Sequence, residues 1–363
     1  MKVAIIGLSK SGKTTIFNTL TKGNAEVTAY SSSLQPNIGI AKVPDSRLDT
    51  LTETFHPKKH TPAEVNYVDI GASLKASSNK GEITGEVLNY LTTADALLQV
   101  VRTFEAKNIV HSEGSIDAER DISTLDLELA FSDLAIIERR LNKIDSALKK
   151  AKVTERESYY KEQSLLNRVK KDLENDIPIR QQTFDQHEHK TIQHYQFLTE
   201  KPMMIILNTG EDQLSQSEKI ESEIRESYSQ FAVIAICGKL EMELSQLDDS
   251  SAREFRDTMG LAEPALDRVI RSSYRLLGLS SFFTTGADEV KAWTIPNNTP
   301  APQAAGKVHS DIEKGFIRAE VISFADFERC ENTSEARKKG LLRTEGKNYI
   351  VQDGDIINYL FNI

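Results

Sequence analysis

The types and spacing of residues 7–14 are those of a loop that binds a polyphosphate. The segment is GLSKSGKT and fits the pattern G-x-x-x-x-G-K-[ST]. Gly7 and Gly12 would allow the backbone to turn its N–H groups towards the phosphates. The ammonium group of Lys13 would bridge the β- and γ-phosphates, and the hydroxyl group of Thr14 would ligate Mg²⁺. The alternative is a glycine-rich turn that holds no ligand.

The segments on either side favour phosphate binding. Residues 2–6 are a short apolar run typical of a strand, and residues 15–20 have a helical pattern. This is the context that the motif requires, because the N-terminus of a helix adds free donors and the positive end of a dipole. The residues expected to bind the nucleotide are Ser9, Lys10, Ser11, Gly12, Lys13, Thr14 and Thr15.

The elements that would position this loop alternate between strand and helix patterns. Apolar runs at residues 96–101 and 203–207 are typical of buried parallel strands. Further strand candidates lie at residues 38–43, 64–69 and 233–236. The pattern predicts an α/β fold, a P-loop NTPase domain with a mostly parallel sheet and nucleotide at the carboxyl ends of its strands.

Residues 115–199 interrupt this alternation. Two apolar seams with spacings of three and four flank a charged stretch at residues 149–156, and Pro178 should end or kink the second helix. We predict an antiparallel, coiled-coil-like helical arm; the alternative is two surface helices packed on the sheet. The seam residues are Leu134, Ile137, Leu141, Ile144 and Leu148, then Leu166, Val169 and Leu173.

After Gly278 the composition indicates a small α+β module. Strand patterns occur at residues 293–298, 316–322, 348–351 and 356–361, and residues 352–355 give a turn signal. The predicted domains are a discontinuous nucleotide-binding domain (1–114 and 200–277), the helical insertion (115–199) and the C-terminal module (278–363).

Composition limits the classes of function. Hydrophobic residues make up 39% of the chain and charged residues 27%, and no apolar run is long enough for a membrane span. Because the first strand begins at once and only Cys237 and Cys330 are cysteines, we expect a cytoplasmic protein without disulfides. The net charge of −9 argues against non-specific nucleic-acid binding but leaves structured RNA possible. The scattered His56, His60 and His111 are expected to be surface residues.

The order of these domains, together with the C-terminal sequence, resembles a known family. The C-terminal sequence is similar to that of the Obg-like ATPases, the YchF branch of the translation-factor P-loop GTPases. The similar segments are residues 292–295 (AWTI), 301–307 (APQAAGK), 313–319 (EKGFIRA) and 345–351 (EGKNYIV). The resemblance covers essentially the whole chain. It implies that the C-terminal module is a β-grasp domain of TGS type.

The resemblance also implies which base is recognised. Typical GTPases carry N-K-x-D after a buried strand, and its aspartate accepts two hydrogen bonds from guanine. This chain has Asn208, Thr209, Gly210 and Glu211, which is similar to the N-x-x-E of the family and implies a preference for ATP over GTP. Asn208 and Thr209 would meet adenine, and the segment of Cys237 and Gly238 would close the base pocket.

The phosphate loop departs from the family sequence GLPNVGKS at Ser9 and Lys10. In potassium-dependent relatives the asparagine at the second position helps to hold a monovalent cation. The ammonium group of Lys10 would replace that cation and assist catalysis; alternatively, Lys10 points to solvent and the potassium site is lost. Either way, we expect ATPase activity that does not distinguish K⁺ from Na⁺.

The two switch segments have also diverged. Ser33 stands where the family has a threonine that ligates Mg²⁺, and Asp69 is retained to reach Mg²⁺ through water. Ala72 replaces the glycine of D-x-x-G, and Ser73 follows it. A serine orients an attacking water poorly, so we expect slow intrinsic hydrolysis that a partner could accelerate.

These observations predict a Mg²⁺-dependent nucleotide switch that binds and slowly hydrolyses ATP. By resemblance, its partner would be the ribosome, in particular the large subunit, or structured RNA; no DNA specificity or membrane association is expected, and the chain would be a monomer. The alternatives are a GTPase of the same class and a pseudo-ATPase that binds nucleotide without useful turnover. A metabolic kinase is disfavoured, since no site for a small substrate is recognisable.

Overall fold

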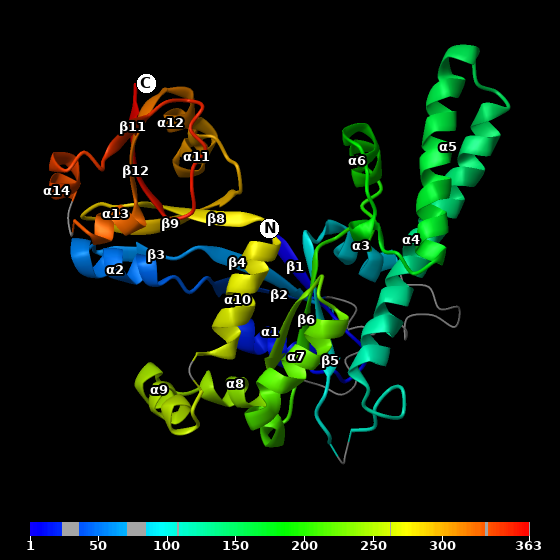
Figure 1. The fold of residues 1–363 in the computed structure, drawn as a ribbon, viewed down its shortest axis with the longest axis horizontal. Coiled ribbons are helices and arrows are strands. Elements are labelled where there is room, and N and C mark those ends of the chain that lie inside the picture. Colours follow the sequence, from blue (N-terminus) through cyan, green and yellow to red (C-terminus); the bar gives the residue numbers. More distant parts are fainter. Residues whose placement is uncertain (24–35, 71–84, 107–108, 262, 331–332, 363) are drawn as a thin grey trace. The chain divides into compact units, whose positions relative to one another are not determined.

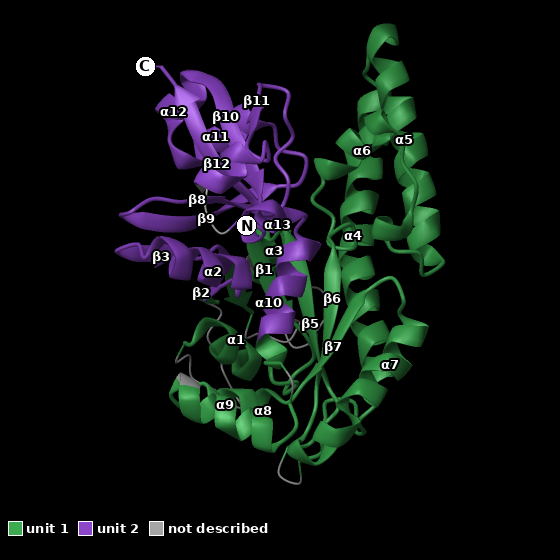
Figure 2. Cartoon of the chain, turned by 60° about the vertical axis from the view of Figure 1, so that its left-hand side comes forward, with its two compact units in different colours: residues 1–39, 66–266 green, residues 40–65, 267–363 purple. Residues whose placement is uncertain are grey.

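A computed structural model describes residues 1–23, 36–70, 85–106, 109–261, 263–330 and 333–362 (Figure 1). The chain forms two compact units, each assembled from two segments (Figure 2). Unit 1 consists of residues 1–39 and 66–266, and unit 2 of residues 40–65 and 267–363. Among the described residues, no helix is both long and apolar enough to cross a membrane.

The core of unit 1 is a six-stranded sheet with the order β2-β4-β1-β5-β6-β7. The neighbours from β4 to β7 pair in parallel, as the sequence predicted. Its strands are β1 (Lys2–Ile6), β2 (Asn37–Lys42), β4 (Glu64–Asp69), β5 (Ala96–Arg102), β6 (Met203–Asn208) and β7 (Ala232–Ile236). The division into units falls within β2 and β4, whose residues 40–42 and 64–65 are grouped with unit 2.

The central strands β5 and β6 are buried along their whole length, as expected for parallel strands with both faces covered. The connecting helices are α1 (Lys13–Thr21), α3 (Gly85–Thr93), α7 (Ser217–Ser227), α8 (Gly238–Leu244) and α9 (Asp249–Thr258), with a 3₁₀ helix η3 (Glu211–Gln216) after β6. This arrangement confirms the predicted P-loop α/β fold.

The predicted helical arm is present in unit 1. Helices α4 (Ala118–Leu148) and α5 (Val153–Glu174) form a hairpin (Figure 1), followed by η2 (Ile179–Gln181) and α6 (Gln186–Gln193). The seam residues Ile137, Ile144, Leu166 and Val169 are fully buried between the helices. Helix α5 ends four residues before Pro178, so the proline follows the arm and does not kink it.

A buried carboxylate joins the base of the arm to the chain that leads into β6. Asp133 on α4 accepts hydrogen bonds of 2.8 Å from the backbone N–H groups of Leu198 and Thr199, and one of 2.7 Å from the Thr199 hydroxyl. Burial raises the pKa of Asp133 to about 6, although these hydrogen bonds oppose the shift. The arm is thus anchored by a specific polar contact as well as by its apolar seam.

Unit 2 is built on a second six-stranded sheet with the order β11-β10-β12-β8-β9-β3. Its strands are β3 (Lys59–Thr61), β8 (Leu279–Thr284), β9 (Glu289–Pro296), β10 (Phe316–Ser323), β11 (Arg343–Glu345) and β12 (Asp355–Phe361). Its helices are α2 (Ser46–Phe55), most of α10 (Ala265–Leu276), α11 (Ala301–Val308), α12 (Ser310–Lys314), α13 (Phe324–Glu328) and α14 (Thr333–Lys338).

Two features of unit 2 differ from the sequence-based expectations. Residues 348–351 were predicted as a strand, but they contribute only an isolated bridge between Ile350 and Pro300. Residues 40–65 group with unit 2, because β3 pairs in parallel with β9 and Arg47 forms an ion pair of 2.8 Å with Asp353. The structure divides the chain into two units, so the predicted division into three domains stays a prediction.

Candidate nucleotide-binding site

The phosphate loop lies between β1 and α1, and neither of its two glycines can be replaced without a clash. Gly12, immediately before α1, has φ 97°, and a Cβ atom there would lie 2.1 Å from Nδ2 of Asn208. A Cβ atom on Gly7 would lie 2.4 Å from the carbonyl oxygen of Val100. The loop is therefore packed closely against the ends of β5 and β6, which explains the glycines in the pattern.

Lys13 is the buried cation of the loop. Its ammonium group donates hydrogen bonds to the carbonyl oxygens of Gly7, at 3.1 Å, and Leu8, at 3.0 Å. Burial lowers the pKa of Lys13 to about 8, although the nearby charge of Asp69 opposes this. A bound anion would favour the charged ammonium, so this environment suits a phosphate ligand.

A hydroxyl and a carboxylate meet beside Lys13. The hydroxyl of Thr14 donates a 2.8 Å hydrogen bond to Oδ2 of Asp69, which also lies 3.4 Å from Nδ2 of Asn37. Asp69 is completely buried, and within the described ranges its other oxygen, Oδ1, has no hydrogen-bond partner. Magnesium prefers oxygen ligands of this kind, so the residues present fit a Mg²⁺ site.

The other predicted loop residues differ in exposure. Ser11 is buried, whereas Ser9 and Thr15 are partly exposed. Lys10 is exposed and has φ 62°, a left-handed conformation that costs about 1–2 kcal/mol for a residue with a Cβ atom. Asparagine tolerates this conformation better than lysine does.

Asn208, at the end of β6, connects two loops of the site. Its Nδ2 donates to the carbonyl oxygen of Ser11 at 2.9 Å, and its Oδ1 accepts from the N–H of Gly238 at 3.1 Å. Both ends of the amide are therefore engaged within the protein. The side chain joins the phosphate loop to the start of α8, while its predicted contact with adenine stays a prediction.

The remaining base-site candidates lie at the same end of the sheet, after β6 and β7. Thr209 is buried, and its hydroxyl has no hydrogen-bond partner among the described residues. Glu211 and Lys239 form an ion pair of 2.7 Å near the surface. Cys237 is buried, and burial raises the pKa of its thiol. Their contact with a nucleobase stays a prediction.

Comparison with known proteins places this geometry in a family. A family model described as a 50S ribosome-binding GTPase matches residues 2–143, and the YchF GTPase C-terminal model, described as a protein of unknown function, matches residues 279–362. The chain is 39% identical to the ribosome-binding ATPase YchF of Escherichia coli O157:H7, covering 100% of this chain and 99% of the relative.

The chain belongs to the YchF family of Obg-like ATPases.

More distant members of the YchF family agree with this assignment. Identity is 36% to the Bacillus subtilis ribosome-binding ATPase YchF, with both chains covered completely. It is 34% to Obg-like ATPase 1 of Caenorhabditis elegans, covering 100% of this chain and 92% of the relative. The solved structure of the Schizosaccharomyces pombe YchF GTPase superposes with a TM-score of 0.87 at 30% identity, covering 99% of this chain and 97% of that one.

One expectation about this YchF-family chain was wrong. His111 was expected at the surface, but it is buried and its Nε2 lies 2.8 Å from Oδ2 of the equally buried Asp121. Its Nδ1 accepts a hydrogen bond from the N–H of Glu113. The spacing of ten residues between the histidine and the aspartate gives no local pattern, so the sequence alone did not reveal the pair.

The residues of the two switches are only partly described. Ser33, Ala72 and Ser73 lie outside the described residues. Asn37, the first residue of β2, is described and approaches Asp69. Sequence reasoning assigned no role to Asn37, although its place directly after Pro36 in a family-like segment was a usable signal.

Proposed function

We propose that this chain is a Mg²⁺-dependent nucleotide switch that binds ATP in preference to GTP, hydrolyses it slowly and associates with the large ribosomal subunit. The observation that carries the proposal is the phosphate loop, with a buried Lys13 and a Thr14–Asp69 pair beside it. The names of the relatives, ribosome-binding ATPase and Obg-like ATPase, support the choice of nucleotide and partner. A cytoplasmic, monomeric protein fits this role.

Each residue of the loop has a distinct part in this proposal. Lys13 would exchange its two carbonyl acceptors for phosphate oxygens and neutralise them. Thr14 would bind Mg²⁺ directly and Asp69 through water, with Ser33 as the remaining ligand from the first switch. Mg²⁺ bound there would offset the negative charge that develops on the phosphates. Lys10 would add a second positive charge at the loop.

The preference for adenine rests on the residues that follow β6. Glu211 occupies the place of the guanine-binding aspartate, and its carboxylate is paired with Lys239. Without two hydrogen bonds to a well-placed carboxylate, guanine loses about 1–3 kcal/mol for each bond. Thr209, with its buried hydroxyl, is available to a base that enters between this segment and Cys237.

Calorimetric titration of nucleotide-free protein with Mg²⁺ and slowly hydrolysed analogues of ATP and GTP tests this assignment. We expect tighter binding of the ATP analogue, and Lys13→Ala as a control should weaken both. Tighter GTP binding would make the chain an ordinary GTPase of this class. Binding of neither nucleotide would reject the switch and leave a scaffold role.

A pseudo-ATPase is the second candidate, because Ala72 and Ser73 replace the usual residues of the second switch. Multiple-turnover phosphate release separates the two. We expect slow release that Lys13→Ala abolishes and that is equal in K⁺ and Na⁺. Release no faster than that of Lys13→Ala would favour the pseudo-ATPase, and clear stimulation by K⁺ would contradict the proposed role of the Ser9–Lys10 substitution.

A further inference from the structure

Positive charge is concentrated in one short part of this acidic chain. The whole chain has a net charge of −9, but residues 139–156 contain seven basic and two acidic residues, a net charge of +5. These residues cover the end of α4, the connecting turn and the first residues of α5. We call Lys143, Lys149, Lys150, Lys152 and Arg156 the basic tip. Its sign is opposite to that of the molecule as a whole.

The basic tip lies at the free end of the α4–α5 hairpin (Figure 1). All five of its side chains are exposed. The first part of α4 packs in the core around the sheet as far as Leu129, and the helix continues to Leu148, so the turn lies about 28 Å farther along the helix. The hairpin thus carries the positive charge well away from the sheet of unit 1.

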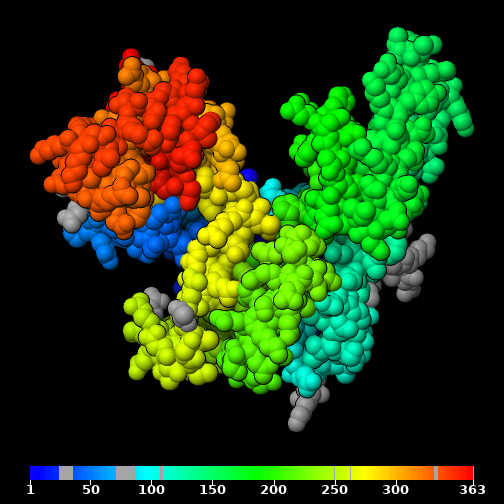
Figure 3. All heavy atoms as spheres, in the orientation of Figure 1, coloured from blue at the N-terminus to red at the C-terminus, as the bar shows by residue number. Residues whose placement is uncertain are grey.

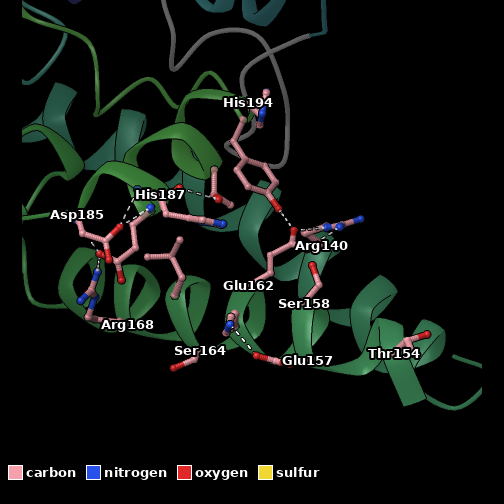
Figure 4. A pocket seen from close by; sticks show the side chains of 15 residues that line it. Arg140, Thr154, Glu157, Ser158, Glu162, Ser164, Arg168, Asp185, His187 and His194 are labelled. Carbon is pink, nitrogen blue, oxygen red and sulfur yellow. Dashed lines mark hydrogen bonds and ion pairs between the residues drawn. The ribbon is translucent and has the colours of Figure 1, made fainter. Parts of the chain in front are cut away.

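Basic residues farther down the arm, below the tip, form ion pairs. Figure 4 shows the cleft between α5 and α6, which is also visible in Figure 3, and the cations that line it are paired. Arg140 lies 2.7 Å from Glu162, and Arg168 lies 2.9 Å from Glu188. By contrast, within the described ranges no member of the basic tip forms an ion pair. The cations that line this cleft are therefore neutralised, whereas those of the basic tip are available to a partner.

The scaffold beneath the basic tip is well ordered by packing. Ile144 is fully buried one helical turn from the end of α4, and Gln163 donates a 2.7 Å hydrogen bond to Asp145 across the two helices. The turn itself is fixed, because the Arg156 side chain donates to the carbonyl oxygen of Ala151. A partner would therefore meet these charges in a preformed arrangement, which lowers the entropy cost of binding.

We propose that the basic tip binds the phosphate backbone of RNA. This inference rests on the proposed ribosome association and names the surface that would make the contact. Unpaired lysines are suited to phosphates as point charges and need no sequence-specific pattern. An acidic protein is the less suitable partner, since protein interfaces have an apolar centre. Among residues 139–156, the one large hydrophobic side chain that is strongly exposed is Val153.

The test uses the full chain and a triple variant, Lys149→Gln, Lys150→Gln and Lys152→Gln. The matched control replaces Lys171, Lys190 and Lys219 by glutamine, which removes the same charge from exposed positions on α5, α6 and α7. Each protein is assayed for co-sedimentation with purified large ribosomal subunits and for binding to a 20-base-pair RNA duplex, over a range of salt concentrations. Equal melting temperatures and ATPase rates would show that the variants are folded.

We expect the tip variant to bind both probes about tenfold or more weakly, with the slope of log K against log salt smaller by about 2–3, and the control to match the unmodified chain. Loss on subunits but not on the duplex would overturn the RNA assignment in favour of a ribosomal protein. Unchanged binding by the tip variant would overturn the inference while leaving ribosome association intact. If the unmodified chain binds the duplex through the tip but not the subunits, the inference stands and the proposed ribosome association fails.

Discussion

At the scale of single residues, Asn208 is the side chain on which the geometry of the site most depends. Replacing it by alanine would leave the carbonyl of Ser11 and the N–H of Gly238 buried without their present partners. Each unsatisfied group costs about 1–3 kcal/mol. We expect Asn208→Ala to lower the free energy of unfolding by about 2–4 kcal/mol in urea titrations and to weaken ATP analogue binding. Glu211→Gln, at an exposed position, serves as the control and should leave stability nearly unchanged; an equal loss in both would contradict the role of Asn208.

Lys10 offers a second test at this scale, because its backbone conformation and its charge can be separated. Lys10→Asn should raise the free energy of unfolding by about 0.5–1 kcal/mol, since asparagine tolerates φ 62° better. Lys10→Ala removes the charge without this conformational gain. A lower rate of phosphate release in Lys10→Ala would identify the ammonium as a tethered catalytic cation. An unchanged rate would mean that Lys10 does not take part in hydrolysis.

At the scale of elements, Asp133 joins the arm to the chain that leads into β6. Its titration makes the free energy of unfolding depend on pH. Its pKa in the folded protein, about 6, is above the value of about 3.9 in an unfolded chain, so the folded state binds the proton more tightly. The stability that it contributes is present below about pH 4 and is lost as the pH rises through 6.

Asp133→Asn removes this titration. We expect the unfolding free energy of the unmodified chain, relative to that of Asp133→Asn, to fall by about 2 kcal/mol between pH 4.5 and pH 7.5. Urea titrations of both proteins at several pH values measure this difference. Asp145→Asn, which makes the same change from carboxylate to amide at an exposed position of the same helix, is the control. A difference that is constant or grows with pH would contradict the raised pKa.

The elements also show what the sequence could predict and where it fell short. β5 and β6 were predictable because a nearly continuous apolar run is typical of a buried parallel strand. β3, at Lys59–Thr61, has three polar residues and pairs with β9, some 230 residues later, so no local pattern could indicate it. Residues 348–351 have the sequence pattern of a strand, but they form only one isolated β-bridge, between Ile350 and Pro300.

The same distinction applies to the candidate site. The phosphate loop is a local pattern, and its spacing alone predicted Lys13 and Thr14 at the start of the helix that follows the loop. The link from Asn208 to Ser11 joins residues 197 positions apart, and the pairing of His111 with Asp121 depends on how a loop folds back on α4. Contacts of this kind are set by tertiary packing, which a single sequence does not encode in its periodicity.

At the scale of the whole molecule, the two units have separate hydrophobic cores. One core, which includes Leu97 and Ile205, lies around the parallel sheet of unit 1. The other, which includes Phe282 and Val321, lies in unit 2. The phosphate loop, Asp69 and Asn208 all belong to unit 1. A nucleotide held by these residues should therefore stabilise unit 1 directly.

Differential scanning calorimetry with and without Mg²⁺ and an ATP analogue tests this expectation. At a ligand concentration of 100 times the dissociation constant, binding adds about 2.7 kcal/mol to the stability of the state that binds it. We expect the transition of unit 1 to move to higher temperature while that of unit 2 stays in place, and EDTA to reduce the shift. Asp69→Asn should show a smaller shift, since it weakens the Mg²⁺ site. If the entire endotherm moves as one, the two cores unfold cooperatively, and nucleotide binding in unit 1 is coupled energetically to unit 2.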